Sequence, residues 1–344
     1  MNRLASYLLE DSKKIYDSID FKPLFGKCVL ITGASGMLGI YFLACLKHLA
    51  NNFPGSVKLT AIVHSEPVGY LKELLNYNGA EILLGDLSDR DFCHSLPDVD
   101  FVVHAAGYAQ PGRFLSNPEK TLKINTSTTF DLFEKLLPDG KFLFVSSSEV
   151  YSGLPGGKYT EDQIGNSNTD HPRSCYIEGK RCGEAIVNAY RSKGVEAKSV
   201  RLSLAYGPGT KTDDKRVLPS FIEKALKEKK ISLLDDGKAI RTYCYVADAV
   251  ENMWNVLFRG KEHVYNVGGF SKTTIAELAV KIGENLGVPI EIPLSSSESL
   301  VGSPQDVSLD IERMESEFGK KEFVSFDDGI FRTIGWYKEL YNLT

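Results

Sequence analysis

Residues 28–39 read Cys28-Val-Leu-Ile-Thr32-Gly33-Ala-Ser-Gly36-Met-Leu-Gly39, an apolar strand-forming run that passes directly into a glycine-rich turn. A helical pattern over Leu38–Ala50 follows. Glycine permits a tight turn and close approach to a diphosphate, and the start of a helix offers free N–H groups and a positive dipole end. This order predicts a phosphate-binding turn for a dinucleotide, formed by Gly33, Ser35, Gly36, Met37, Leu38 and Gly39.

Strand-like and helical patterns alternate along the chain as far as Leu202. The predicted strands are Lys27–Thr32, Leu59–Val63, Ala80–Leu84, Phe101–His104, Lys141–Ser146 and Ala197–Leu202. The predicted helices between them include Leu38–Ala50, Asn117–Leu137 and Ser174–Ser192. This alternation implies a parallel sheet covered on both faces, and right-handed crossovers make it a doubly wound α/β fold.

The pattern changes after about Leu204. A loop rich in glycine and aspartate precedes predicted helices at Val217–Lys229, Val246–Phe258 and Thr274–Leu286, with a short strand near Ile231–Leu234. We expect residues 1–25 to form an N-terminal helical extension, 26–203 a dinucleotide-binding domain and 204–344 a smaller substrate lobe. The lobe should be interleaved with the first domain, to which the helix near 246–258 returns.

Composition and charge argue against several classes of partner. The 40 basic and 45 acidic residues give a net charge of −5, whereas a nucleic-acid-binding protein normally has a basic surplus. The uncharged stretch Cys28–Leu46 is interpreted as a buried strand, turn and helix and not as a membrane span, because glycines interrupt it. The six scattered cysteines are typical of free thiols in a reducing compartment such as the cytoplasm. The histidines show no metal-ligand spacing, so no metal site is expected.

The residue that follows the second strand should contact the adenosine ribose. The sequence there is Val63-His64-Ser65-Glu66, without the arginine or lysine that would favour NADP, and it favours NAD without deciding against NADP. After the third strand, Asp86 is a candidate to hydrogen-bond the adenine amino group, beside Leu87; a plain turn aspartate is the alternative.

Among the 16 tyrosines, only Tyr176 has a lysine four residues later, Lys180. That spacing places both side chains on one helix face. A free tyrosine has a pKa of about 10, and a neighbouring ammonium together with an oxidised nicotinamide would lower it. Ser146–Tyr151 follows a strand, so its hydroxyl groups lie at the carboxyl edge of the sheet, where ligands bind. An incidental Tyr–Lys pair and a serine-rich turn are the alternatives for each motif taken alone.

Taken together, these motifs resemble the extended short-chain dehydrogenase/reductase family, the NAD-dependent epimerases and dehydratases of nucleotide sugars. The resemblance runs from about Lys27 to the C-terminus and also includes Val103–Gly107, Asn125 and Tyr206–Gly209. It implies a Rossmann-type doubly wound parallel sheet with a smaller C-terminal α/β substrate lobe, and a homodimer formed through Asn117–Leu137 and Ser174–Ser192. It further implies that NAD is bound by the phosphate-turn residues with His64, Asp86, Leu87, Ala105, Ala106, Gly107, Asn125, Tyr176 and Lys180.

Within the family, Pro172–Arg181 and Ser147–Tyr151 look like segments of the UDP-glucuronate decarboxylases. The 4,6-dehydratases have Asp-Glu where this chain has Ser148-Glu149. The resemblance implies catalysis by Tyr176, Lys180, Ser147, Ser148 and Glu149, and substrate contacts from Ser148, Glu149, Arg216 and Arg241. The chain departs from the family at Leu204, where an asparagine is common, and at Val307, where an arginine is common, so the nucleotide is not fixed.

The predicted first step is oxidation of the sugar at C4: Tyr176 removes the hydroxyl proton as hydride leaves C4, Ser147 hydrogen-bonds the developing ketone, and Lys180 holds Tyr176 and the nicotinamide ribose. Three outcomes stay open: decarboxylation of a C6 carboxylate, 4-epimerisation and net 4-oxidation. A non-catalytic dinucleotide-binding sensor is the alternative from another class.

Overall fold

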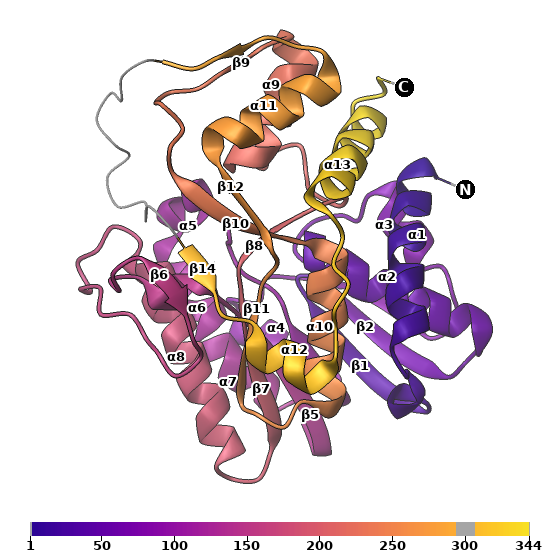
Figure 1. The fold of residues 1–344 in the computed structure, drawn as a ribbon. Helices are drawn as coiled ribbons and strands as arrows, with labels where there is room; N and C mark the ends of the chain where they lie inside the picture. The colour runs from indigo at the N-terminus through magenta and orange to yellow at the C-terminus, as the bar shows by residue number, and fades with distance from the viewer. Residues whose placement is uncertain (1, 294–306, 344) are drawn as a thin grey trace.

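The computed structural model describes residues 2–293 and 307–343, and its largest element is a seven-stranded sheet (Figure 1). The strand order is β11-β7-β5-β4-β1-β2-β3, and every neighbouring pair is parallel. The bounds are β1 Lys27–Thr32, β2 Val57–Val63, β3 Ala80–Leu84, β4 Val99–His104, β5 Leu136–Ser147, β7 Glu196–Leu202 and β11 Val264–Val267. The expected doubly wound fold is confirmed.

The centre of the sheet is buried on both faces, which explains the continuous apolar runs. Val29, Leu30 and Ile31 of β1 are fully buried although successive side chains point to opposite faces. The strand order reverses between β1 and β4, and in doubly wound sheets ligands bind beyond the carboxyl ends of the strands at such a point. The glycine-rich turn follows β1 at this point.

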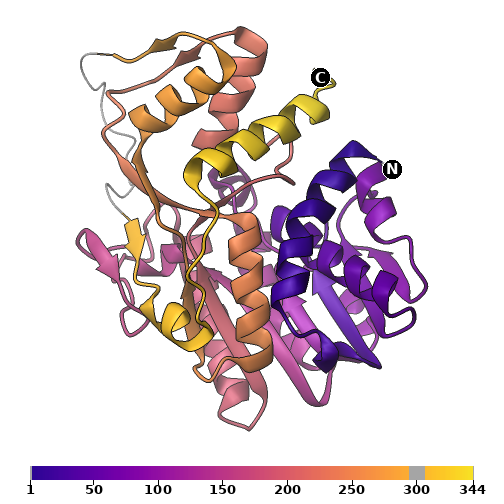
Figure 2. The same cartoon turned by 45° about the vertical axis from the view of Figure 1, so that its right-hand side comes forward.

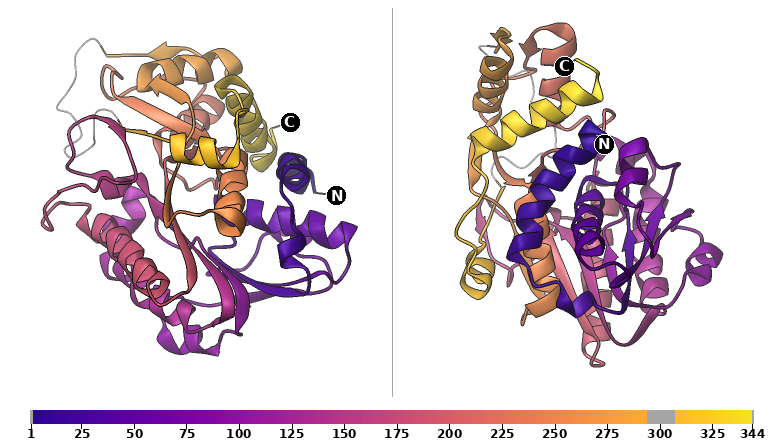
Figure 3. Two further views of the ribbon diagram at one scale, coloured as in Figure 1. Left: turned by 60° about the horizontal axis from the view of Figure 1, so that its bottom comes forward. Right: turned by 90° about the vertical axis from the view of Figure 1, so that its right-hand side faces the viewer.

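Helices cover both faces of the sheet (Figures 1 and 3). One face carries α2 (Met37–Asn52), α3 (Gly69–Leu74) and α10 (Val246–Arg259), with α1 (Arg3–Ser18) packed over α2 and α10. The other face carries α4 (Arg90–Ser95), α6 (Pro118–Asn125), α7 (Ser127–Phe133) and α8 (Ser174–Arg191).

The predicted single helix Asn117–Leu137 is wrong. The backbone of Thr126 leaves helical geometry, with φ −118° and ψ −83°, and separates α6 from α7. Leu136 instead pairs with Val99 of β4, and β5 starts there. The apolar spacing of this stretch continues across the break, so periodicity alone could not locate it.

A second lobe sits at the carboxyl edge of the sheet (Figure 2). Its helices are α9 (Val217–Glu228), α11 (Ile275–Leu286) and α13 (Phe326–Leu340). Its strands are β8 (Leu204–Tyr206), β10 (Ile240–Tyr245) and β12 (Ser271–Thr274) in one sheet, and β9 (Ile231–Ser232) with β13 (Ile290–Glu291) in another. Smaller elements complete the described chain: η1 (Lys22–Leu24), α5 (Pro111–Ser116), η2 (Ser148–Tyr151), β6 (Gly157–Tyr159), β14 (Val307–Leu309) and α12 (Glu312–Phe318).

The chain after residue 204 returns to the large sheet, because β11 pairs with β7 and α10 contacts α2. The division at residues 25 and 203 stays a prediction. The chain departs from the family pattern at Val307, which opens β14, and the residues just before it, Pro304 to Asp306, lie outside the described residues. Among the helices of residues 2–293 and 307–343, none combines the length and apolarity that crossing a bilayer requires.

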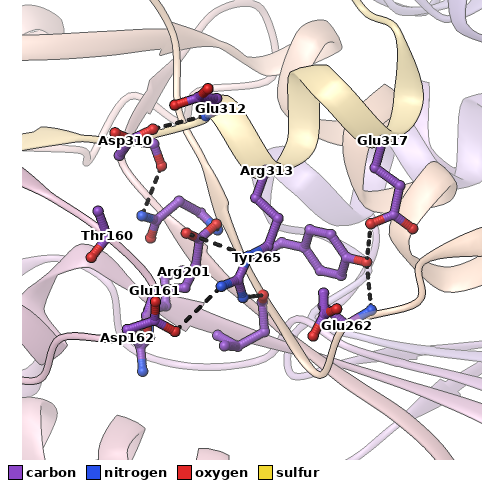
Figure 4. A network of polar contacts seen from close by, with 12 residues as sticks. Thr160, Glu161, Asp162, Arg201, Glu262, Tyr265, Asp310, Glu312, Arg313 and Glu317 are labelled. Atoms are coloured by element: carbon purple, nitrogen blue, oxygen red, sulfur yellow. Dashed lines mark hydrogen bonds and ion pairs between the residues drawn. The ribbon is translucent and has the colours of Figure 1, made fainter.

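A buried polar network joins the end of β5 to the C-terminal segment. Tyr151 donates to Asn266 Oδ1 at 2.7 Å and accepts from Arg201 at 2.9 Å. The Arg201 guanidinium is paired with Glu184 at 2.8 Å. Beside it, Arg313 of α12 reaches Asp162 at 3.4 Å (Figure 4). These contacts fix the turn that follows β5, where the predicted catalytic serines lie.

The N-terminal helix α1 is tied to both parts of the molecule by one buried carboxylate. Asp11 is 5% exposed and accepts hydrogen bonds from Tyr41 of α2 at 2.8 Å and from Tyr245, the residue that precedes α10. It also pairs with Arg332 of α13 at 2.6 Å. The predicted helical extension therefore joins α2 to α13.

Asp11→Ala should destabilise the protein by about 1–3 kcal/mol, because it leaves two buried tyrosine hydroxyl groups and a partly exposed arginine without their acceptor. Glu10→Ala is the matched control, since Glu10 is 3.5 Å from the same arginine but its side chain is 67% exposed; a cost below about 1 kcal/mol is expected. Urea unfolding measures both, and equal costs would contradict the role given to Asp11.

Candidate active site

The glycine-rich turn between β1 and α2 is shaped by close backbone approaches. Gly33 has φ +66°, and a Cβ there would lie 2.7 Å from Ala105 O at the end of β4. A Cβ on Gly39 would lie 2.3 Å from Gly33 O. A Cβ added to Gly36, the N-cap of α2, would have only Gly33 O within 4 Å. The side of the turn at Gly36 is thus open next to the first-turn N–H groups of α2, and this arrangement fits a diphosphate.

The predicted adenosine contacts lie beyond β2 and β3. His64 is exposed just after β2, and Leu87 is buried. Asp86 accepts hydrogen bonds from Ser88 N at 2.9 Å and from Lys120 Nζ at 2.7 Å. Burial alone would raise the pKa of Asp86, but the bonds from Lys120 and Ser88 outweigh it and bring the pKa to about 2. Asp86 is therefore an ionised acceptor; sequence reasoning missed Lys120.

The segment after β4 packs against β1 and α6. Ala106 N donates to Thr32 Oγ1 at 3.1 Å, and the same hydroxyl group is 2.7 Å from His104 Nδ1. Burial lowers the pKa of His104 to about 3, so its ring is neutral. Asn125 is fully buried, and its Oδ1 has no hydrogen-bond partner within the described part of the chain. A buried acceptor without a partner fits a site that a ligand or water completes.

Tyr176 lies near the start of α8 with only 6% of its surface exposed. Its ring stacks on Phe114 of α5, with centroids 4.9 Å apart and an interplanar angle of 9°. Burial raises the pKa of Tyr176; the hydrogen bond with Ser147 and the charges of Arg173 and Arg216 oppose this, while Glu149 adds to it.

The expected lowering of this pKa is thus not found in the protein without ligand. Lys180 is not among the groups that shift it. Phe114 also escaped sequence reasoning, because it lies 62 positions away and belongs to a helix that the sequence pattern did not predict.

Lys180 connects α8 to the edge of the sheet. Its Nζ donates to Val145 O of β5 at 2.7 Å and lies 5.8 Å from the centre of the Tyr176 ring. A Cβ on Gly107 would be 3.7 Å from the same Nζ, so the segment after β4 passes close by. Burial lowers the pKa of Lys180 to about 7, against a smaller rise from Glu184. Tyr176 and Lys180 therefore share one helix face, directed at the carboxyl ends of β4 and β5.

Ser147, Ser148 and Glu149 form the turn into η2. Ser147 Oγ accepts from Glu149 N at 3.2 Å, and the Glu149 carboxylate accepts from Arg173 at 2.6 Å. Burial raises the pKa of Glu149, and the positive charges of Arg173, His171 and Arg241 lower it in part. Arg173 was not predicted as a site residue, although it stands just before α8 in the segment that carries Tyr176.

The two arginines predicted to contact substrate come from the second lobe. Arg216 pairs with Asp214 at 2.6 Å and acts on the pKa of Tyr176. Arg241, in β10, acts on the pKa of Glu149. The structure thus brings Tyr176, Lys180 and the Ser147–Glu149 turn together from the sheet side, with Arg216 and Arg241 facing them from the lobe.

One group of described residues has the arrangement of a metal site: ligand atoms of His94, Asp131 and Glu134 lie within 4.8 Å of one another. These residues belong to α4 and to the end of α7, and none of them is among the catalytic candidates. Arg90 lies 3.5 Å from Asp131 and already balances its charge. No metal is assigned to the group.

Comparisons with known proteins agree with this geometry. A family model described as the NAD-dependent epimerase/dehydratase family matches residues 29–268. UDP-glucuronic acid decarboxylase 6 of Arabidopsis thaliana is 29% identical over 88% of the chain and 86% of its own length. UDP-glucuronic acid decarboxylase 1 of Xenopus tropicalis is 28% identical over 91% of the chain and 72% of its own length.

Solved structures show the same fold. A dTDP-glucose 4,6-dehydratase from Streptomyces venezuelae with NAD bound has a TM-score of 0.78 and 24% identity, over 92% of this chain and 98% of that one. A UDP-glucose 4-epimerase from Thermotoga maritima has a TM-score of 0.77 and 22% identity, over 91% and 99%.

Lys180→Met should change the pH dependence of stability. The ordinary pKa of 10.5 falls to about 7 on folding, so between these values the unfolded chain holds a proton that the folded chain lacks. The free energy of unfolding of the parent should rise through this window, by up to about 1.4 kcal/mol per pH unit relative to the variant, and the gap should be constant below about pH 7. Urea unfolding across the range measures it.

Lys193→Met, at a lysine just beyond α8, is the control and should leave the pH profile of the parent unchanged, because this side chain is exposed to water in the folded protein as well. The difference in free energy of unfolding between the parent and Lys180→Met could instead be the same at all pH values. That result would mean that Lys180 keeps its proton in the folded protein.

Proposed function

The chain belongs to the NAD-dependent epimerase/dehydratase family, and from this premise we propose that it oxidises the sugar of a nucleotide sugar at C4 and removes a C6 carboxyl group as carbon dioxide. The relatives named UDP-glucuronic acid decarboxylase, which match across 88–91% of the chain, support this choice. When bound, NAD would supply a hydride acceptor for the oxidation at C4 and a hydride donor for the later reduction of the ketone. The glycine-rich turn, Asp86 and the segment Ala105–Gly107 would hold it.

Tyr176 is the base for the C4 hydroxyl proton. Because burial raises its pKa in the protein without ligand, positive charge has to assist its ionisation, and Arg173, Arg216 and the Ser147 hydroxyl group all act in that direction. Ser147 can hydrogen-bond the developing C4 ketone from the same side. Acid–base assistance of this kind contributes about 10²–10⁴-fold to a rate.

Glu149 is the residue that favours decarboxylation over the other outcomes. A C4 ketone makes a C6 carboxylic acid a β-keto acid: the C5–C6 bond breaks, carbon dioxide leaves and the electron pair stays on C5 conjugated with the ketone. A proton must then be added at C5. Burial raises the pKa of the Glu149 carboxyl, and Arg173 beside it lowers this pKa only in part, so Glu149 is suited to hold such a proton. Arg241 supplies positive charge for the departing carboxylate.

The same first step serves the alternatives, 4-epimerisation and net 4-oxidation, and the structural likeness to a UDP-glucose 4-epimerase supports keeping epimerisation as a candidate. Leu204, in β8, replaces the common asparagine, so UDP is not assumed as the nucleotide. A non-catalytic sensor would have no need for a buried tyrosine, lysine and serine at one sheet edge.

We further propose a homodimer and a cytoplasmic setting. Phe130 of α7 and Leu122 of α6 are 46% and 39% exposed, and a second copy packed on α6, α7 and α8 would cover them. All six cysteines are free, which is consistent with a reducing compartment.

The decisive test is a panel of UDP-, GDP- and dTDP-linked sugars with and without a C6 carboxylate, incubated with the purified protein. We expect carbon dioxide and a shortened sugar from an acidic member, with no net reduction of NAD. Arg241→Met should lower kcat/KM for the acidic sugar more than for its neutral counterpart, because only the former presents a carboxylate. Turnover of neutral sugars alone would eliminate decarboxylation in favour of epimerisation or net oxidation.

A further inference from the structure

The loop between β8 and α9 crosses the start of α2 and places a lysine beside the phosphate turn. Lys211 Nζ lies 3.5 Å from Ser35 Oγ, and Thr210 Oγ1 lies 3.4 Å from Met37 Sδ. Gly209 has φ +93° and approaches α2 so closely that a Cβ would be 2.3 Å from Ile40 Cδ1. A segment of the second lobe is thus packed directly on the cofactor turn of the first domain.

The backbone of this loop is fixed by the C-terminal helix. Trp336 Nε1 donates to Thr210 O at 2.8 Å, and the Tyr337 hydroxyl group donates to Lys211 O at 3.3 Å. Both rings belong to α13 and are fully or almost fully buried. The position of Lys211 over the turn is therefore set by packing.

The Lys211 ammonium is partly desolvated without an ion pair of its own. Lys211 is half-buried, and burial lowers its pKa, while Asp213 raises it and Arg113 lowers it. The nearby Asp213 carboxylate is bound by Arg113 of α5. Within residues 2–293 and 307–343, no carboxylate forms an ion pair with Lys211. A desolvated ammonium in this setting is suited to an anion that arrives with a ligand.

We propose that Lys211 is a further ligand of the cofactor diphosphate, contributed by the second lobe and positioned by α13. Its charge adds to the N–H groups of the glycine-rich turn, which carry only partial charges. The contact rests on the NAD site of the family and deepens it: the cofactor would bridge the sheet domain and the lobe, so that NAD binding fixes the loop that runs on to Arg216 on the substrate side.

The test is titration of the nucleotide-free full chain with NAD, ADP and adenosine, and separately with UDP. Lys211→Met should raise the dissociation constants of NAD and ADP by roughly five- to thirty-fold. It should leave the dissociation constant of adenosine, which has no phosphate, unchanged. Lys215→Met is the matched control: Lys215 lies in the same loop but is exposed and paired with Glu223 at 2.8 Å, so binding of all three should stay within about twofold of the parent.

Three results would overturn the proposal. If Lys211→Met binds NAD as the parent does, the lysine makes no contact with the diphosphate. If the binding of adenosine is weakened as much as that of NAD, the lysine acts through the shape of the loop. If only the binding of UDP is weakened, Lys211 contacts the nucleotide of the sugar substrate and not the cofactor. A parent that binds no NAD would instead reject the cofactor assignment itself, and Lys211→Gln replaces the methionine variant if that variant does not fold.

Discussion

The hydrogen bond from Lys180 Nζ to Val145 O is the contact on which the site depends. It joins α8 to the carboxyl end of β5 and orients the helix face that carries Tyr176. The ammonium is desolvated there, and its pKa falls to about 7, so the protein retains it at a cost in stability. The parallel register of β1, β4 and β5 places the glycine-rich turn, Gly107 and Ser147 along the same edge. Sheet topology and this one contact together bring the candidate site residues to one edge of the sheet.

The lobe that completes the site is held by side chains from the two ends of the chain. Asp11 of α1 accepts hydrogen bonds from Tyr41 and Tyr245 and forms an ion pair with Arg332. The ion pair joins the first helix to α13. Through Trp336 and Tyr337, α13 then fixes the loop that carries Lys211 and leads to Arg216. The N-terminal extension is therefore connected to the glycine-rich turn through α13 and the loop that carries Lys211.

Local signals predicted the sheet and the helix that carries Tyr176 and Lys180 well. β1 and β3 match the predicted bounds; β1 is a continuous apolar run of a buried parallel strand, whereas β3 at the edge of the sheet is partly exposed and is marked by the turns on either side. The spacing of Tyr176 and Lys180 is a property of one helix and was readable without tertiary structure. Contacts between distant segments could not be read from the sequence in this way. Phe114, Arg173 and Lys211 meet their partners only through folding, and the direction of the Tyr176 pKa depends on burial that no spacing reveals. The cap of α13 was a usable signal, since Ser325 is followed three residues later by Asp328.

Rapid mixing of the NAD-loaded enzyme with an acidic nucleotide sugar such as UDP-glucuronate tests the central claim most directly, by following the absorbance of reduced nicotinamide. The parent and Tyr190→Phe, a variant of α8 outside the site, should both show a transient rise followed by a fall. Tyr176→Phe should bind NAD as the parent does but form the transient at least about 10²-fold more slowly, because the C4 hydroxyl proton has no base. A transient of parental rate and amplitude in Tyr176→Phe would contradict the assignment of this tyrosine as the base.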